Sequence, residues 1–288
     1  NEKPYYAWFE VAKAFAKIGY IPVCLHVNAK YVGAAQNRPR FILLAMRDDI
    51  YTGVTRNSTD KNFLEAIAPA KILFDRVRSG EDPEYGCLPY FDIEKNPDFF
   101  DSKIFASLKT HENSGLVTVR DAIDDLRTVK GKNSLYVERI NNIFENINSH
   151  SLNKQCNHDH RSNNSKVKAR FRFYQIMTKL PKESSKEISK YLKTEGASGI
   201  SSSTLNAVQK YWVLDLDGNQ IKKPSENQLL GLLSSLYTKK QTQRALQADL
   251  PAPAALSIPD DACHYHESVG MQRTLTVREM ARIQSFPD

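Results

Sequence analysis

The chain has 288 residues, 41% of them hydrophobic, which is enough to bury a core divided between two domains. Lys and Arg outnumber Asp and Glu by 40 to 33, and the resulting net charge of +7 favours a polyanionic partner. A mean hydropathy of −0.51, with no apolar run of about 18 residues, excludes a membrane span. Four cysteines in a chain this long do not suggest a disulfide framework, so a reducing, intracellular setting is expected.

The N-terminal region has the pattern of a helix followed by two strands. Apolar residues recur at three- and four-residue spacing over residues 5–18, which predicts an amphipathic helix that ends at Gly19. Residues 21–27 and 41–46 are predicted strands. The second is almost wholly apolar, so we expect it to be covered on both faces. A helix followed by buried strands is typical of a layered α/β sheet.

The next part of the chain mixes helical and irregular patterns. Residues 61–77 are predicted to form a helix, whereas residues 78–94 are interrupted by glycines and prolines and are expected to be irregular. A further helix is predicted to begin within residues 118–126, with Thr118 as its N-cap. Residues 141–166 are rich in Asn, Ser and His and are expected to form a loop.

Three helices are predicted in the C-terminal half. Helical patterns at residues 184–193 and 202–212 flank a glycine-containing turn, a spacing that resembles a helix-turn-helix. Two surface helices joined by a loop are the favoured interpretation, and a DNA-reading pair is the alternative. Near the end of the chain, Thr274 or Thr276 is expected to cap a helix that continues through Gln284.

A row of polar side chains precedes the second predicted strand. Gln36, Arg38 and Arg40 alternate with Asn37 and Pro39, so in an extended chain the first three point to the same side. Such a row is costly to bury unless it meets an acceptor-rich ligand or paired carboxylates. The planar fork of arginine suits a phosphate, a carboxylate or a base carbonyl. A ligand contact and a structural network with nearby acids are equally compatible with this pattern.

Cysteine and histidine cluster at two places in the second half of the chain. These residues are Cys156, His158, His160, Cys263, His264 and His266. They could supply zinc ligands, but the spacings C-x-H-x-H and C-H-x-H are cramped, because adjacent side chains in a loop rarely converge on one tetrahedral ion. We therefore predict no metal site. No glycine-rich phosphate-binding motif occurs among the 12 glycines either.

Two motifs resemble the DNA cytosine-5 methyltransferase family. Gly33, Gln36, Arg38 and Arg40 match that family's eighth motif, G-x-P-Q-x-R-x-R, with Ala35 in place of the usual proline. Residues 273–288, RTLTVREMARIQSFPD, contain every fixed position of the ninth motif, R-x-L-T-x-R-E-x-A-R-[LI]-Q-x-F-P-D.

Weaker similarities to the same family lie between these motifs. Residues 118–126 resemble a T-V-x-D-A-[IL]-x-D-L segment, and residues 156–162 resemble an N-H-x-x-R stretch. Residues 251–265 are similar to P-x-P-T-x-x-[ST]-[IL]-P-D-D-x-x-H-Y, with Ala254 in place of threonine.

The resemblance implies a fold and a division of the chain. We expect part of an S-adenosylmethionine-dependent methyltransferase sheet, which is Rossmann-like, joined to a mixed α+β target recognition domain. Residues 1–50 are expected to belong to the catalytic domain, residues 51–267 to the recognition domain, and residues 268–288 to return to the catalytic domain. Basic runs in the middle range, at residues 166–172 and 222–223, are expected to contact DNA phosphates, although a solvated helix face is equally compatible with each.

The resemblance also implies a reaction. In this family the target cytosine is flipped out of the duplex, a cysteine thiolate adds to carbon 6, and carbon 5 receives a methyl group from S-adenosylmethionine. Arg40 is expected to hydrogen-bond the carbonyl oxygen of the flipped base. Arg38 is expected beside it, on the sugar-phosphate or within the active-site network, and Gln36 is expected to order the loop.

The ninth motif is expected to be mainly architectural. Arg278, Glu279, Arg282 and Gln284 would brace the recognition domain against the catalytic sheet, through ion pairs at a partly buried seam. The same set of expected DNA-binding or structural residues includes Arg273 and Thr276.

Several family motifs are missing. The cofactor loop F-x-G-x-G, the nucleophile motif P-C-Q and the E-N-V stretch do not occur, and Cys24, Cys87, Cys156 and Cys263 all lie outside a P-C-Q context. We therefore expect an internal portion of a longer enzyme that is inactive alone and leaves S-adenosylmethionine to be bound mainly by other parts. A non-catalytic DNA-binding regulator and a tRNA cytosine-5 methyltransferase are the alternatives.

The resemblance also suggests partners and a location. Double-stranded DNA is the expected partner, a restriction endonuclease is a further candidate, and the protein is expected to act as a monomer. The first ten residues lack a basic segment and a small-residue cleavage site, so no signal peptide is expected. A cytoplasmic location follows for a bacterial protein, and a nuclear location for a eukaryotic one.

Overall fold

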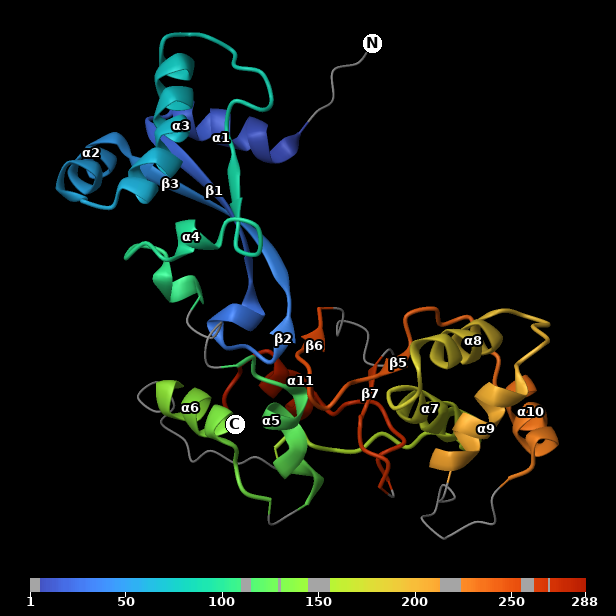
Figure 1. Cartoon of the computed structure of the whole chain (residues 1–288). Coiled ribbons are helices and arrows are strands. Elements are labelled where there is room, and N and C mark those ends of the chain that lie inside the picture. Colours follow the sequence, from blue (N-terminus) through green and yellow to red (C-terminus); the bar gives the residue numbers. More distant parts are fainter. Residues whose placement is uncertain are drawn as a thin grey trace. The chain divides into compact units, whose positions relative to one another are not determined.

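The structure is a computed structural model of the 288-residue chain. It describes residues 6–109, 115–128, 131–144, 156–212, 224–254, 262–268 and 270–288. The chain divides into two compact units (Figure 1), which consist of Asn1–Gly33 with Asn37–Leu116 and of Ala34–Gln36 with Val117–Asp288. These units follow spatial contacts, whereas the roles predicted for residues 1–50, 51–267 and 268–288 stay predictions.

The first unit contains a sheet of three strands in the order β3-β1-β4. The central strand β1 (Tyr20–Asn28) pairs antiparallel with β3 (Pro39–Arg47) and parallel with β4 (Tyr90–Asp92). All but two residues of β1 are buried, because the strand has a neighbour on each side and its Ile, Val, Leu and Cys side chains pack into both faces. The predicted strands at residues 21–27 and 41–46 are confirmed.

The prediction that the second strand would be covered on both faces is wrong. No residue of β3 is buried, and Phe41 and Leu44 are 40% and 38% exposed. The reason lies in the sheet order, which puts β3 at an edge of the described sheet with β1 as its partner. An apolar run predicts a strand but does not distinguish an edge strand from a central one.

Helices pack against this sheet to complete the first core. They are α1 (Ala7–Lys17), α2 (Asp48–Asn57), α3 (Lys61–Arg78) and α4 (Pro97–Phe100), with short 3-10 turns η1 (Ala29–Val32) and η2 (Ala106–Lys109). Phe9, Ile67 and Phe100 are among the fully buried side chains of this core. The helices predicted at residues 5–18 and 61–77 are confirmed, whereas residues 78–94, predicted to be irregular throughout, end in β4.

The second unit contains two groups of elements, and the first surrounds the C-terminal helix. This group consists of α5 (Val119–Ile123), η3 (Asp124–Arg127), α6 (Leu135–Phe144), α11 (Val277–Ile283) and the short strand β6 (Ala252–Pro253). Strand β6 pairs with β2 (Gln36–Asn37), of which Gln36 belongs to the second unit. Thr118 begins α5 in a capping box, as predicted, with its side chain bonded to the amide of Asp121 and the Asp121 carboxylate bonded back to the Thr118 amide. The apolar faces of the elements in this group form a second core that includes Ile123 and Ile283.

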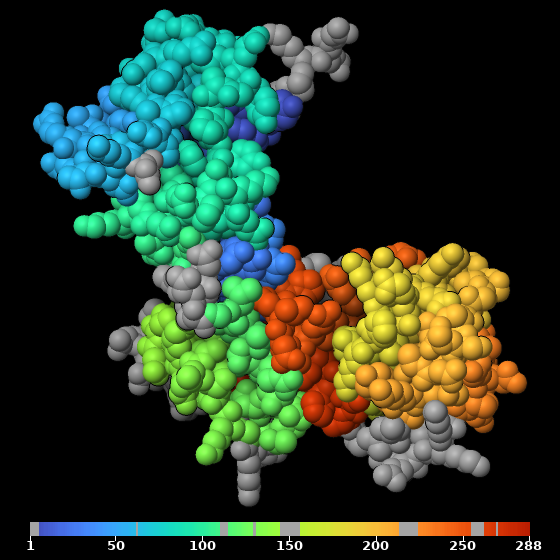
Figure 2. Space-filling view, viewed as in Figure 1, coloured from blue at the N-terminus to red at the C-terminus, as the bar shows by residue number. Residues whose placement is uncertain are grey.

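The second group is a cluster of four helices (yellow to orange in Figures 1 and 2). They are α7 (Ser165–Met177), α8 (Lys182–Lys193), α9 (Ser202–Tyr211) and α10 (Glu226–Ser234), and β5 (Arg244–Ala245) pairs with β7 (Ala262–Cys263) beside them. The helices predicted at residues 184–193 and 202–212 are confirmed. The connection between α8 and α9 covers residues 194–201, which is longer than the turn of about three to four residues of a helix-turn-helix.

The loop predicted at residues 141–166 is wrong at both ends. Helix α6 continues to Phe144 and α7 begins at Ser165, while residues 145–155 lie outside the described part of the chain. The described chain is thus a mixed α/β structure with small sheets, and a Rossmann-like arrangement stays a prediction. Over the described residues, no helix combines the length and the apolar character needed to cross a membrane.

Candidate functional site

The polar row at residues 36–40 crosses the boundary between the two units. Gln36 belongs to the second unit, where its side chain is 2% exposed and its Nε2 lies 3.5 Å from the carbonyl oxygen of Pro253. Arg38 and Arg40 belong to the first unit, where Arg38 is half-buried and Arg40 is exposed. The three side chains therefore have different environments, although their sequence spacing suggested one shared face.

Asn28 fixes the backbone segment that precedes Arg40 through side-chain hydrogen bonds. Its side-chain oxygen accepts hydrogen bonds from the amides of Lys30 and Arg38, at 3.3 and 3.0 Å, and its Nδ2 donates to Oδ1 of Asn37 at 2.7 Å. Asn28 is buried and ends β1, so one side chain connects both ends of the segment that leads into β3.

The two arginines of the row lack carboxylate partners. Arg40 donates from Nη1 to the neighbouring Pro39 carbonyl at 2.8 Å, and neither Arg38 nor Arg40 forms an ion pair within the described residues. Within the described residues, these two arginines form no network with nearby acids. Their guanidinium groups, one just before β3 and one near its start, are available to an external acceptor.

The C-terminal motif begins with a buried ion pair. Arg273 donates from Nη1 and Nη2 to the two carboxylate oxygens of Glu279, at 2.8 and 2.7 Å, and both side chains are buried. Burial disfavours the charged carboxylate, but the hydrogen bonds and charge of Arg273, nearby His264 and the hydrogen bond from the Thr276 amide together hold the pKa of Glu279 below its usual value. Thr276 caps α11, in a capping box with Glu279, so the expectation of a threonine cap is confirmed with Thr276 rather than Thr274.

Arg282 is the centre of a second buried network. It is fully buried and donates to Asp288 from Nε and Nη2, at 2.6 and 2.7 Å, and to Asp125 from Nη1 at 2.6 Å. The backbone carbonyl of Arg282 accepts a hydrogen bond from the hydroxyl of Tyr136 at 2.6 Å. The C-terminal motif is thereby joined to η3 and to α6, which are far from it in sequence.

Arg278 and Gln284 differ in what they contact. Arg278 donates from Nε to the Cys156 carbonyl at 3.0 Å and from Nη1 to the Pro287 carbonyl at 2.8 Å. Gln284 is exposed and contacts the carbonyl of Met280 in its own helix, at 3.3 Å. All of these contacts lie within the second unit, so the predicted bracing against the catalytic sheet stays a prediction.

The histidines near this motif make hydrogen bonds of their own. His158 contacts Thr276 Oγ1 through Nδ1, at 2.9 Å, and the Leu126 carbonyl through Nε2, at 3.0 Å. Burial lowers the pKa of His264 to about 3, so this imidazole is neutral, and its Nδ1 accepts from the amide of His266 at 3.0 Å. A search of the described residues for three or more grouped His, Cys, Asp or Glu side chains with metal-binding geometry finds none.

Three of the four cysteines do not have the environment of a nucleophile. Burial raises the pKa of Cys24 to about 12 and also raises the pKa of Cys263 and of the half-buried Cys87. Cys156 is exposed and precedes Asn157, which has a positive φ of 58°. A raised pKa disfavours the thiolate that nucleophilic attack requires.

One of the predicted phosphate-binding runs is used inside the protein. Arg170 donates to the carbonyls of Leu236 and Tyr237, at 2.8 and 3.2 Å, and the buried Arg172 donates to the Glu267 carbonyl at 2.8 Å. The prediction that residues 166–172 contact phosphates is therefore wrong for both arginines. Their side chains lie on the face of α7 that packs against the rest of the unit, and they bind its backbone carbonyls. Residues 222–223 lie outside the described part of the chain.

Sequence reasoning missed the acidic partners of Arg282. Asp125 and Asp288 both lie inside stretches that resemble the family, but their contact with Arg282 joins positions 157 and 6 residues apart. A single sequence contains no signal for the longer pairing, whereas the shorter one joins an Arg and an Asp of the same motif.

Comparison with known families agrees with these motifs. A family model described as C-5 cytosine-specific DNA methylase matches residues 1–288. The chain belongs to this family. No curated protein and no solved structure matches it. The resemblance drawn from the two motifs is thus confirmed at the level of the family, and membership supports a methyltransferase that acts on DNA, in a family that uses S-adenosylmethionine as methyl donor.

Proposed function

We propose that this chain forms the DNA-binding and base-contacting part of a DNA cytosine-5 methyltransferase. The observation that carries the proposal is the state of Arg38 and Arg40, which stand at the start of β3 without a carboxylate partner among the described residues. Unpaired guanidinium groups next to a well-held backbone suit a ligand rich in hydrogen-bond acceptors. Family membership makes duplex DNA with an extrahelical cytosine the matching ligand.

In this proposal the residues of the row have separate tasks. Arg40 donates hydrogen bonds to the carbonyl oxygen of the extrahelical cytosine, which offers the acceptor geometry that a guanidinium fits. Arg38 contacts the adjoining sugar-phosphate. Gln36, buried against Pro253, holds the start of the row in the second unit.

The residues present do not fit the methyl donor. A cavity of about 440 Å³ in the second unit is lined by charged side chains that are already paired, with Arg120 on Asp249 at 3.0 Å and Lys179 on Glu267 at 2.8 Å. The F-x-G-x-G motif of the family is absent from the 288 residues. S-adenosylmethionine supplies the methyl group in this family, and we assign neither its binding nor the nucleophile to this chain.

A DNA-binding regulator without catalysis is the second candidate. It is favoured by the cysteines, because none of the four lies in a P-C-Q context and three have a raised pKa. The two candidates differ in whether a P-C-Q motif lies in the same reading frame about 60–90 residues before Gly33, a spacing that the family resemblance implies.

The test of the proposal is a gel shift with the purified chain. Labelled duplex DNA of mixed sequence and labelled tRNA are compared at salt concentrations from about 0.05 to 0.3 M. We expect tighter binding to duplex DNA and a steep loss of affinity with salt, because phosphate contacts release counterions. Preference for tRNA would instead favour an RNA methyltransferase, and a flat salt response would exclude a phosphate-based interface.

A further inference from the structure

The segment between α10 and β5 is exposed and strongly basic. Lys239, Lys240 and Arg244 all lie on the surface, with Gln241 and Thr242 exposed between them. The surrounding residues 227–248 contain no Asp or Glu. Residues 239–244, called the basic loop below, therefore combine three cations with amide and hydroxyl groups and with no acidic residue in the same stretch of chain.

The basic loop is fixed at several points. The amide of Thr238 donates to the Leu192 carbonyl at 2.9 Å, and Gln243 is 2% exposed. Lys193 Nζ donates to the Gln241 carbonyl at 2.6 Å, and Gln241 Nε2 donates back to the Lys193 carbonyl at 3.1 Å. These reciprocal bonds tie the loop to the end of α8, so its exposed side chains project from a defined backbone.

Arg244 itself projects from a short paired strand. It is the first residue of β5, which runs parallel to β7 with Arg244 opposite Ala262 and the buried Ala245 opposite the buried Cys263. Within the described part of the chain, the guanidinium of Arg244 forms no hydrogen bond or ion pair. Arg273 and Arg282 of the same unit, by contrast, are buried on carboxylates. A held backbone that presents an unpaired guanidinium to solvent is typical of a site for an external anion.

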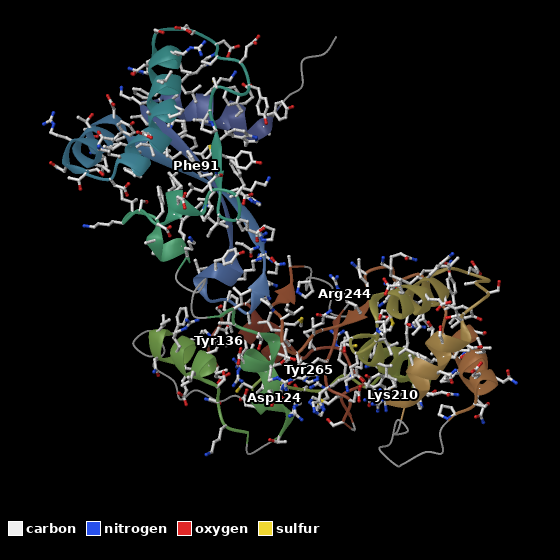
Figure 3. The ribbon with its side chains drawn as sticks, in the orientation of Figure 1. Phe91, Asp124, Tyr136, Lys210, Arg244 and Tyr265 are labelled. Atoms are coloured by element: carbon white, nitrogen blue, oxygen red, sulfur yellow. The ribbon has the colours of Figure 1, made fainter. Side chains whose placement is uncertain are left out.

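Helix α9 is the competing surface. Its exposed side chains include Asn206 and Lys210. Figure 3 labels Lys210 near the helices and Arg244 at β5 beside them, so the two residues belong to different elements. The start of α9 is occupied by an acid, because Glu187 accepts hydrogen bonds from the Ser201 amide and hydroxyl at 2.7 and 2.8 Å. A carboxylate at the helix N-terminus repels phosphate from the end that a recognition helix presents to DNA.

We propose that the second unit binds duplex DNA through the basic loop and not through helix α9. This inference rests on the proposed function, which makes DNA the substrate. Lys239 and Lys240 contact phosphates as point charges. Arg244 contacts either a phosphate or a guanine edge through its planar fork, and both acceptors belong to the same duplex.

Fluorescence anisotropy with the full chain tests this inference. The probe is a fluorescein-labelled duplex of mixed sequence, titrated at several salt concentrations. The variants are Lys239→Ala/Lys240→Ala, Arg244→Ala and the conservative Arg244→Lys. The matched control is Lys210→Ala, which removes an exposed lysine from α9 in the same unit. Thermal denaturation of each variant shows whether it is folded.

We expect Arg244→Ala to weaken binding about tenfold, since a hydrogen bond to a charged group is lost. The double lysine variant should weaken binding and lower the salt slope by about one for each phosphate contact removed. Lys210→Ala should bind within about twofold of the unmodified chain, and Arg244→Lys should recover part of the affinity lost in Arg244→Ala if the contact is a phosphate.

The outcomes separate the two proposals. Unchanged binding by both loop variants, with weaker binding by Lys210→Ala, would overturn the assignment of the basic loop and leave the proposed function standing. If the unmodified chain failed to bind duplex DNA at low salt, the proposed function would be wrong, and the loop assignment with it.

Discussion

Two sets of arginines in this chain have opposite surroundings. In the C-terminal motif, Arg273 is buried on the carboxylate of Glu279, and Arg282 is buried on the carboxylates of Asp125 and Asp288. Arg38 and Arg40, in the polar row, have no ion pair among the described residues, and Arg40 is exposed. Both sets lie in motifs that match the same family, so a motif match alone does not show whether an arginine supports the fold or contacts a ligand.

The two sets differ in how much folding free energy the protein loses when the arginine is removed. Removing a buried arginine leaves its carboxylates buried without a partner. This loss of stability is far larger than the net stability that the ion pair contributes. Removing an exposed arginine costs the fold little, so any large effect must come from a lost contact with a ligand. The following predictions test this contrast in order of decreasing size.

Arg282→Ala should destabilise the chain most. The substitution leaves Asp125 and Asp288 buried without their guanidinium, so we expect the free energy of unfolding to fall by about 3–5 kcal/mol. Urea denaturation measures the change, with Arg40→Ala as the matched exposed arginine, expected within about 0.5 kcal/mol of the unmodified chain. Similar stabilities for the two variants would remove the contrast.

Arg40→Ala should affect methylation without affecting stability. In an enzyme assembled with a catalytic cysteine and cofactor site, the loss of a charged hydrogen bond to the base should cost about 1.5–3 kcal/mol of activation free energy, roughly 10- to 100-fold in rate. The control is Arg47→Ala, an exposed arginine at the other end of β3 that pairs with Asp49 at 2.7 Å. Methylation within about threefold of normal would show that Arg40 does not touch the flipped base.

His264 should make the fold sensitive to acid. Burial lowers the pKa of its imidazole to about 3, whereas in the unfolded chain the pKa is near its ordinary value of about 6.5. Between these two values the unfolded state binds one more proton, so stability is lost as the pH falls below about 6.5. The loss should approach about 1.4 kcal/mol per pH unit.

The measurement for His264 is the free energy of unfolding between about pH 7 and pH 5, for the unmodified chain and for His264→Gln. The variant should lose less stability over this range, because its side chain cannot be protonated. Burial also lowers the pKa of His160 and His266, and these residues remain in both proteins, so the difference in slope reports His264. Equal slopes would contradict a buried neutral imidazole at this position.

Gln284→Ala should have the smallest effect. Gln284 matches a fixed position of the ninth motif, but its side chain is exposed and contacts only the Met280 carbonyl among the described residues. We expect the stability to change by less than about 0.5 kcal/mol. A larger loss of stability would mean that Gln284 contacts a part of the chain outside the described residues. A selective loss of DNA binding would assign it to the interface.

The sequence predicted local features better than partnerships. Thr118, and either Thr274 or Thr276, were expected as caps. Thr118 and Thr276 are caps, and a capping box can be predicted because it depends on residues three positions apart. The edge position of β3 was not predicted, because strand order depends on contacts distant in sequence. The same limit applies to Arg282, whose partner Asp125 is 157 residues away.

The candidate site was predicted in part. Residues 36–40 were chosen from an alternating pattern and a family resemblance, and the pattern could not show that the boundary between the units passes between Gln36 and Asn37. Charge runs were the least informative signal. Arg170 and Arg172 belong to a basic run that suggests phosphate binding, yet helical geometry directs both towards backbone carbonyls of the same unit.

The side chain of Asn28 has a consequence for affinity. Because it bonds Lys30, Arg38 and Asn37 at once, the backbone that bears the guanidiniums of Arg38 and Arg40 is ordered before any ligand arrives. Much of the conformational entropy that binding would otherwise remove has then been lost on folding, so contacts made by Arg38 and Arg40 contribute more fully to affinity. Under the proposed function, this buried asparagine contributes to DNA affinity through the backbone that it orders.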